Sequence, residues 1–341
     1  MINDILNKEE LNKEEIVSLL RTEDCQDVQL LFQKADEVRK VYCGDEVHLR
    51  GIIEFSNYCE QDCLYCGLRK SNSVLERYRM SSAEIMQTAK AIYNMGIQTI
   101  VLQSGEDFSF GGNDIANIIS SIKKKFDVAI TLSLGERDYE EYKLWKTSGA
   151  DRYLLKHETS NPGLYPVYHS NQKLKDRVDH LYFLKSIGYQ IGSGNIISLP
   201  RQTIEDIADD ILLCRELDVD MASFSPFISS PYTPYRKRKN ADLTFTLKVM
   251  AAARIVLKNV HIPATTAIAT LDEFGREKGL QAGANVIMPN FTPNPYREKF
   301  SIYANKKCAK DNPLDCPSCL ENSISLLGRK VATGKGQSLK V

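Results

Sequence analysis

The sequence has no excess of either charge and no long hydrophobic run. Lys plus Arg and Asp plus Glu each number 44 in 341 residues, so the formal net charge is zero. This balance argues against a nucleic-acid footprint or a membrane-surface patch. There is no run of about 18 apolar residues, the length that a transmembrane helix needs. Residues 1–4 lack the charged-then-apolar pattern of a signal peptide. We therefore expect a cytoplasmic protein that binds neither nucleic acid nor membranes.

The sequence also lacks internal repeats and low-complexity linkers, which excludes solenoids and bead-like arrays. What it does have is 43% apolar and 26% charged residues, the balance of a globular protein with a large core. A chain of this length is long for one ordinary domain, but single α/β barrels often reach it.

From residue 47 onward, short apolar runs alternate with amphipathic segments. Strands are predicted at 47–54, 98–103, 127–133, 152–157, 189–197, 221–226, 261–267 and 284–288. Helix signals stand between them: Ser81 and Glu84 form a capping-box pattern, Thr203 and Asp206 open another helix, and Gly96 follows a helix as a C-terminal cap would. Parallel strands joined by right-handed helical crossovers are the usual result of this order.

Eight such strands predict an α/β fold of the (β/α)8 TIM-barrel type, with an open doubly wound sheet as the alternative. Residues 1–45 are predicted to form a helical extension, because apolar residues from Val28 to Val38 repeat at helical spacing. The barrel is expected over 46–290. Residues 291–341 are expected to form a C-terminal loop and helix, with an irregular stretch over 291–318.

Nine cysteines are many for a chain without secretory features, where disulfides are rare and clustered cysteines more often bind metal. Six of them fall into two groups, Cys59/Cys63/Cys66 and Cys308/Cys316/Cys319. The isolated Cys25, Cys43 and Cys214 are interpreted as small hydrophobic residues.

The first group has the spacing Cys-x3-Cys-x2-Cys. Three thiolates without a fourth nearby leave one iron of a 4Fe–4S cluster open, and an open position distinguishes a catalytic metal site from a structural one. A zinc site completed by His48 or His157 is the alternative, as are inert buried cysteines. The loop follows the first predicted strand, so a barrel would place it on the catalytic, carboxyl-terminal face.

This spacing, with Tyr65 before the third cysteine, resembles the signature of the radical S-adenosylmethionine (SAM) superfamily. The resemblance implies that the cluster cleaves SAM to a 5′-deoxyadenosyl radical, and that residues at the strand ends bind SAM. Beside Tyr65, the residues that match such roles are Ser104, Gly105, Glu106, Ser133, Glu158, Arg177 and Ile196. The resemblance assigns Glu106 to the methionyl amino group, Arg177 to the SAM carboxylate and the segment around Ile196 to the adenine.

A narrower resemblance covers about residues 45–330. The segments 50–69, 101–106, 150–155, 263–267 and 284–290 resemble the HydE-type FeFe-hydrogenase maturases, in the biotin-synthase branch of the superfamily. The family implies an iron–carbonyl–cyanide–cysteine precursor as substrate, other maturases as partners, and a reductant such as ferredoxin or flavodoxin. The alternatives are a mutase like methylornithine synthase, a sulfur-insertion enzyme like biotin synthase, or a non-catalytic iron–sulfur or zinc scaffold.

Six further residues are candidates for the substrate cavity, placed on or near the predicted strand tops or the loop after the last strand. They are Arg50, Arg152, Thr265, Thr266, Met288 and Tyr303. Their donors suit an anionic organometallic guest but equally a small carboxylate, and both threonines could be plain strand formers. Lys156 stands where many members carry Arg, and Ser198 and Arg201 stand where Gly is common.

The second cysteine group, Cys308, Cys316 and Cys319, has the spacing with which family members often bind an auxiliary iron–sulfur cluster. The resemblance therefore implies a second cluster, 2Fe–2S or 4Fe–4S. The alternative is three surface thiols that are empty or bind zinc adventitiously.

Overall fold

The computed structural model describes residues 2–170, 172–310 and 316–340; of residues 316 and 317 it describes the backbone alone. In chain order the strands are β1 (Glu46–Leu49), β2 (Gly51–Ser56), β3 (Thr99–Ser104), β4 (Ala129–Ser133), β5 (Arg152–Leu154), β6 (Gln190–Ser193), β7 (Ile196–Ile197), β8 (Met221–Ala222), β9 (Ser225–Pro226), β10 (Val286–Ile287) and β11 (Lys330–Val331).

The helices lie between the strands and at both ends of the chain. They are α1 (Ile2–Leu6), α2 (Lys13–Arg21), α3 (Cys25–Cys43), α4 (Ser82–Asn94), α5 (Gly112–Lys125), α6 (Tyr139–Thr147), α7 (Tyr165–Tyr168), α8 (Leu174–Ser186), α9 (Ile204–Glu216), α10 (Leu243–Leu257), α11 (Thr266–Leu271), α12 (Gly275–Gln281), α13 (Tyr296–Lys299) and α14 (Cys316–Leu326).

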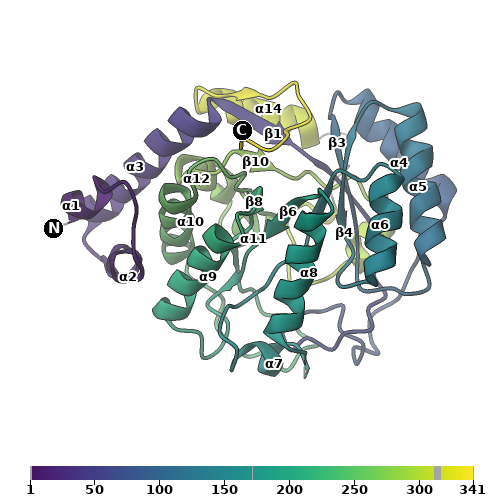
Figure 1. Cartoon of the computed structure of the whole chain (residues 1–341), viewed down its shortest axis with the longest axis horizontal. Coiled ribbons are helices and arrows are strands. Elements are labelled where there is room, and N and C mark those ends of the chain that lie inside the picture. The colour runs from purple at the N-terminus through teal and green to yellow at the C-terminus, as the bar shows by residue number, and fades with distance from the viewer. Residues whose placement is uncertain (1, 171, 311–315, 341) are drawn as a thin grey trace.

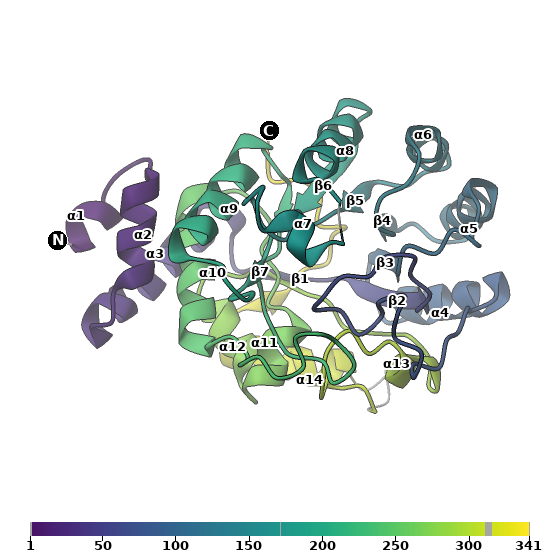
Figure 2. The ribbon, with the colours of Figure 1, turned by 90° about the horizontal axis from the view of Figure 1, so that it is seen from below.

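The strands pair in parallel and curve into a barrel-like sheet. The order β2-β3-β4-β5-β6-β8 forms one ladder, and β1 pairs with β10 and β11. Single bridges join Met221 to His261 and Pro263 to Val286, which continue the ladder from β8 to β10. Helices α4, α5, α6, α8, α9 and α10 lie around the outside (Figures 1 and 2). The predicted TIM-barrel-like fold of parallel strands is confirmed.

The predicted strand at 261–267 is wrong. His261 and Pro263 make one bridge each, and the chain then turns into α11, which begins at Thr266 with Thr265 as its extended N-terminal cap. Pro263 has no N–H to give to a ladder, which limits strand pairing there. The β-branched threonines were a misleading strand signal, because threonine is also a good helix cap.

Three other predicted strands are each divided in two. The segment 47–54 is interrupted at Arg50, between β1, which pairs with β10 and β11, and β2, which pairs with β3. The segment 189–197 is interrupted between β6 and β7 at Gly194, whose φ of 139° lies in a region that L residues avoid. The segment 221–226 is interrupted between β8 and β9. The breaks in 189–197 and 221–226 occur close to the catalytic end of the barrel, so they bend the chain where ligand-binding residues are expected.

Local helix signals are confirmed where they were strongest. Ser81 and Glu84 make a reciprocal capping box at the start of α4, and Thr203 and Asp206 do the same for α9. At the N-terminus, α3 packs against α10 and buries Leu31 and Ala35, as the helical stripe predicts. Of the described residues, no helix combines the length and apolarity that crossing a bilayer would require.

Candidate active site

The loop after β2 carries Cys59, Cys63 and Cys66, and it lies at the carboxyl ends of the strands, on the face that Figure 2 shows. The three side chains are partly buried and lie near one another. Burial raises the pKa of the Cys66 thiol to about 12, and the neighbouring Cys59 adds to this shift. In the described part of the chain, no trio of His, Cys, Asp or Glu side chains is arranged to hold a single metal ion.

This donor set fits the 4Fe–4S cluster that the radical SAM signature implies. Three soft sulfur donors come from one loop of eight residues, which suits iron–sulfur ligation better than hard cations. The thiols are costly to ionise on their own, because burial disfavours the thiolate. Iron would compensate that cost, since a metal binds the thiolate and displaces the proton.

Two arginines hold the cysteine loop in shape, and neither was predicted. Arg77 donates hydrogen bonds to the carbonyl oxygens of Leu68 (2.8 Å) and Arg69 (2.7 Å). Arg69 in turn donates through Nε to Asp62, at 2.8 Å. The Arg69 guanidinium holds the pKa of the Asp62 carboxyl well below its usual range. These contacts fix the backbone just after Cys66 and tie it to Asp62, which lies between Cys59 and Cys63. Their only sequence signal was charge inside an otherwise irregular loop.

His169, just after α7, is a site residue that sequence reasoning missed. Its Nδ1 lies 3.4 Å from the Cys63 Sγ, and its Nε2 lies 3.3 Å from the Tyr65 hydroxyl. The ring stacks on Tyr165 at a centroid distance of 4.4 Å. Burial, helped by Arg177, lowers the pKa of His169 well below its ordinary value, so the imidazole is neutral. More than a hundred residues separate it from Cys63, so no local pattern could reveal the contact.

A His169→Phe substitution should lower the reduction potential of a cluster held by Cys63. An N–H directed at a ligating sulfur stabilises the more negative, reduced state, and phenylalanine keeps the ring but removes that donor. A loss of about 1 kcal/mol corresponds to roughly 40 mV for one electron. A redox titration followed by electron paramagnetic resonance measures the shift, with His48→Phe as the control. An unchanged potential in a variant with full iron content would show that His169 does not donate to the sulfur.

Glu106 and Arg177, predicted separately, are brought together by the fold. Glu106 Oε1 accepts a hydrogen bond from the Glu136 N–H at 3.0 Å and lies 3.9 Å from Arg177 Nη2. Gln61, within the cysteine loop, donates to the other Glu106 oxygen. Burial raises the pKa of the Glu106 carboxyl, and Arg177 opposes that shift. Glu106 thus connects the cysteine loop to the ends of β3 and β4.

Arg177 also has partners that the sequence did not suggest. Its Nε lies 2.8 Å from Glu136 Oε1 and donates to the Tyr165 hydroxyl at 2.8 Å. The guanidinium is buried, and this carboxylate and phenol hold its orientation. A SAM carboxylate would therefore approach an arginine that Glu136 and Tyr165 have already positioned.

Gly105 lies at a point of close backbone approach. A Cβ there would lie 2.2 Å from the Tyr58 carbonyl oxygen and 2.7 Å from the Cys59 Cβ. The preceding Ser104 donates its hydroxyl to the Gly105 carbonyl at 2.6 Å. The end of β3 thus packs directly on the start of the cysteine loop, with no room for a side chain.

Glu158 follows β5 in a left-handed conformation, with φ of 61°, which a non-glycine residue adopts only when its surroundings impose it. Its N–H donates to the Gly194 carbonyl at 2.9 Å, and its carboxylate forms an ion pair with Lys156 at 3.0 Å. Tyr65 lies close enough for Glu158 to raise the pKa of its hydroxyl, after the larger effect of burial.

The remaining predicted SAM contacts lie on the same side of the barrel. Ser133 is the last residue of β4, and Ile196 is the first residue of β7. Behind them is a buried polar network that was not predicted. Asp210 accepts hydrogen bonds from Asn195 (2.6 Å) and Gln202 (3.2 Å) and lies 3.6 Å from His157. This network fixes the residues on either side of Glu158 and Ile196.

The structure divides the predicted substrate residues between the two ends of the barrel. Thr265 and Thr266 begin α11, Met288 follows β10, and Tyr303 lies in the loop beyond it, close to Thr270. Near this end, Lys306 and Glu54 form a buried ion pair, and Asn290 donates to Glu54 at 2.7 Å. The buried Thr265 hydroxyl has no hydrogen-bond partner among the described residues.

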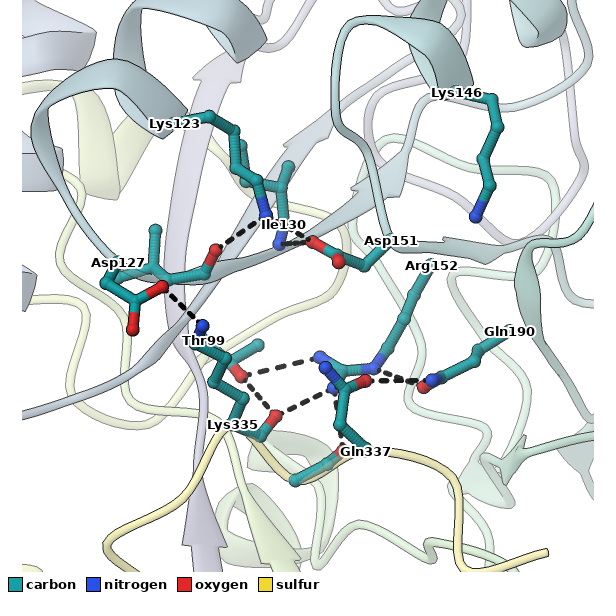
Figure 3. A network of polar contacts seen from close by, with 12 residues as sticks. Thr99, Lys123, Asp127, Ile130, Lys146, Asp151, Arg152, Gln190, Lys335 and Gln337 are labelled. Carbon is teal, nitrogen blue, oxygen red and sulfur yellow. Dashed lines mark hydrogen bonds and ion pairs between the residues drawn. The ribbon is translucent and has the colours of Figure 1, made fainter. Parts of the chain in front are cut away.

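Arg50 and Arg152 do not lie at the strand tops, so that prediction is wrong. Arg50 precedes β2 and Arg152 begins β5, which places both at the opposite end of the barrel. There Arg152 donates to the carbonyl oxygens of Lys335 (2.7 Å) and Gly336 (2.8 Å), as Figure 3 shows for Lys335. The C-terminal segment covers this end. The first residue of a strand lies at the amino-terminal end of the barrel, whereas the last residue lies at the catalytic, carboxyl-terminal end.

The second cysteine group is only partly described. Cys308 is half-buried, and Arg297 donates to its carbonyl oxygen at 3.1 Å. Cys319 is exposed on α14, whereas the side chain of Cys316 lies outside the described residues. Cys308 lines an open groove of about 440 Å³ together with residues of the segment 297–310.

Comparisons with known proteins identify the family. The family model described as the radical SAM superfamily matches residues 53–214, which include the three cysteines and Arg177. The FeFe-hydrogenase maturase subunit HydE of Thermotoga maritima is 47% identical over 325 residues, 95% of this chain and 93% of that protein. The 3-methylornithine synthase of Methanosarcina acetivorans is 29% identical over 82% of this chain and 79% of its own.

Solved structures show the same fold. Methylornithine synthase (PylB) superposes with a TM-score of 0.86 at 24% identity, over 97% of each chain. The FeFe-hydrogenase maturase HydG from Carboxydothermus hydrogenoformans gives a TM-score of 0.82 at 21% identity, over 95% of this chain and 78% of its own. The fold, the cysteine loop and the extent of identity to HydE lead to one assignment: this chain belongs to the radical SAM superfamily and, within it, to the HydE family of FeFe-hydrogenase maturases.

Proposed function

We propose that this chain reductively cleaves SAM to a 5′-deoxyadenosyl radical and uses it in assembling the active site of FeFe hydrogenase. The observation that carries the proposal is the meeting of the cysteine loop with Glu106 and Arg177 at the carboxyl ends of the strands. An iron ligand set and a pair of groups suited to an amino acid moiety adjoin one another there. The high identity to HydE supports the role in maturation.

In this proposal Cys59, Cys63 and Cys66 would hold a 4Fe–4S cluster, and one iron without a protein ligand would be left for SAM. When bound, the cluster supplies the electron that breaks a carbon–sulfur bond of SAM. Glu106 accepts a hydrogen bond from the methionyl ammonium, and Arg177 binds its carboxylate through the guanidinium fork. Glu158 binds the ribose or the ammonium, while Tyr65, Ser104, Gly105, Ser133 and Ile196 line the SAM site. Glu106 and Arg177 are buried and the other groups are half-buried, so bound SAM would leave little room for water near a reactive radical.

The substrate is proposed to be an anionic organometallic precursor held near Thr265, Thr266, Met288 and Tyr303. The Thr265 hydroxyl offers a free donor, and Lys306, three residues after Tyr303, is held in a buried ion pair with Glu54. Lys156 forms an ion pair with Glu158. Its ammonium therefore carries one point charge at a position where many family members have the bidentate guanidinium of arginine.

Other parts of the proposal concern the whole chain. The bridges from β8 through His261 and Pro263 to β10 support a complete (β/α)8 barrel over 46–290, flanked by a helical extension at 1–45 and a tail at 291–341.

Cys308, Cys316 and Cys319 are proposed to bind an auxiliary iron–sulfur cluster. Ferredoxin or flavodoxin is proposed as the reductant, other maturases as partners, and the cytoplasm as the location.

Anaerobic incubation with a set of substrates tests the function. The reconstituted protein, supplied with SAM and dithionite, should form 5′-deoxyadenosine, and a 4Fe–4S resonance should change when SAM is added. The product of a HydG-type maturase should be consumed in step with SAM, whereas dethiobiotin and lysine should not. Consumption of lysine or dethiobiotin alone would establish a mutase or a sulfur-insertion enzyme. Absence of both 5′-deoxyadenosine and the spectral change would leave a scaffold protein.

A further inference from the structure

A run of four cations stands free on the surface near the cysteine loop. Arg236, Lys237, Arg238 and Lys239 lie in the segment between β9 and α10, and all four are exposed. None of them forms an ion pair within the described residues. The chain as a whole has zero formal net charge, so this run is a local concentration and not part of a general excess.

A fifth cation, Arg201, joins this run from the segment after β7. It is exposed and has a φ of 78°, a left-handed conformation that costs about 1–2 kcal/mol for a residue other than glycine. Both Arg201 and Arg238 lie close enough to Tyr235 to lower its pKa against the larger, raising effect of burial. We call Arg201 and Arg236–Lys239 the basic surface.

The basic surface is joined to the cysteine loop by a small aromatic cluster. Tyr235 contacts Tyr168 and Phe227, at centroid distances of 6.4 and 6.3 Å. Tyr65 packs against the same cluster, which also contains Leu164 and Leu199. The Tyr168 carbonyl accepts a hydrogen bond from Leu64 N–H at 3.0 Å, between two of the iron ligands. The Tyr168 hydroxyl donates to the Pro200 carbonyl at 2.7 Å, which ties in Arg201.

An open groove is lined by Ser230 and Tyr232, which precede the basic surface on the same segment, and also by Glu76, Glu298 and Lys299. It has a volume of about 410 Å³, and Tyr232 and Val74 line it although their side chains are 55% and 65% exposed. Val74 lies in the loop that also carries the cysteines. An exposed tyrosine four residues before unpaired arginines suits a protein-binding patch, in which Tyr and Arg contribute most of the energy.

We propose that the basic surface and this groove dock a small acidic electron-transfer protein, of the flavodoxin or ferredoxin class. The inference rests on the proposed function, which requires an electron from outside for each SAM that is cleaved. The reduced donor gives up one electron and leaves oxidised; the electron passes to the cluster and breaks the carbon–sulfur bond, yielding methionine and the 5′-deoxyadenosyl radical. Unpaired cations beside the cluster loop would attract an acidic donor and hold it where the transfer is short.

Charge reversal on this surface tests the proposal. The double variant Lys237→Glu/Lys239→Glu is compared with Lys124→Glu/Lys125→Glu, which makes the same change of charge at the end of α5. The rate of 5′-deoxyadenosine formation is measured with reduced flavodoxin and, separately, with dithionite. We expect the flavodoxin-driven rate at low salt to fall about tenfold in the first variant only. With dithionite, both variants should match the unmodified protein.

Equal loss in both variants, or equal loss with dithionite, would overturn the proposal. Binding of oxidised flavodoxin is measured in parallel, so that docking is scored even if SAM cleavage fails and the proposed function is wrong. A double-stranded DNA fragment serves as the competing probe. Tighter binding of DNA, lost in the same variant, would identify the surface as a nucleic-acid site and also overturn the proposal.

Discussion

A Cys63→Ser variant should form at least 100-fold less 5′-deoxyadenosine than the unmodified protein, or about as much as no enzyme. Loss of a residue that only supports a metal ligand costs about 10–100-fold, and loss of the ligand itself should cost more. Serine has no soft sulfur donor, so two thiolates would remain to hold the cluster. Cys63 also contacts His169, so the substitution changes the atom that faces the buried imidazole. Iron content and electron paramagnetic resonance show whether the cluster is lost.

Two other cysteine variants are controls for this result. Cys25→Ser changes an exposed thiol at the start of α3, far along the chain from the site, and should leave activity and iron content unchanged. Cys319→Ser removes a candidate ligand of the auxiliary cluster and should keep most SAM cleavage, because that cluster is not the one expected to meet SAM. If Cys319→Ser abolished cleavage and Cys63→Ser did not, the two cysteine groups would have been assigned in reverse.

Features that depend on neighbouring residues could be predicted from the sequence. Strands β3 and β4 are buried apolar runs, so they were found almost in full, whereas β1 and β2 were predicted as one strand. The cysteine loop was recognisable because its ligands are seven residues apart at most. The capping box at Ser81 was equally local. The prediction of a strand at 261–267 was wrong because β-branched and apolar residues give the same sequence pattern in a strand and at the start of a short helix.

Features that depend on contacts across the fold could not be predicted. His169 reaches Cys63 only because α7 folds over the cysteine loop. Asp210 lies on α9 and has no sequence mark that separates it from the solvated carboxylates of the same helix. Arg152 was assigned to the wrong end of the barrel. Its strand was predicted, but as the first residue of β5 it lies at the end opposite the catalytic face. The C-terminal segment that covers this arginine has no motif at all.

A Gly194→Ala variant should be strongly destabilised. The φ of Gly194 is 139°, and a Cβ there would lie 2.0 Å from the Ser223 carbonyl oxygen. The obstructing atom belongs to the backbone between β8 and β9, so no side chain can rotate to make room. Strain in φ and the forced backbone shift should together cost about 4 kcal/mol, which corresponds to a Tm lower by roughly 6 °C in a chain of this length. Thermal unfolding followed by circular dichroism measures the change.

Gly96→Ala separates the two causes of this loss. Gly96 also has a positive φ, 77°, but nothing lies within 4 Å of its would-be Cβ, so only the conformational strain of about 1–2 kcal/mol applies. Equal Tm losses in the two variants would show that the contact with Ser223 is relieved at no cost. If the Gly194→Ala protein folds at lower temperature, its SAM affinity should still be reduced, whereas that of Gly96→Ala should not. The reason is that the Gly194 carbonyl accepts the hydrogen bond that holds Glu158 in its left-handed conformation.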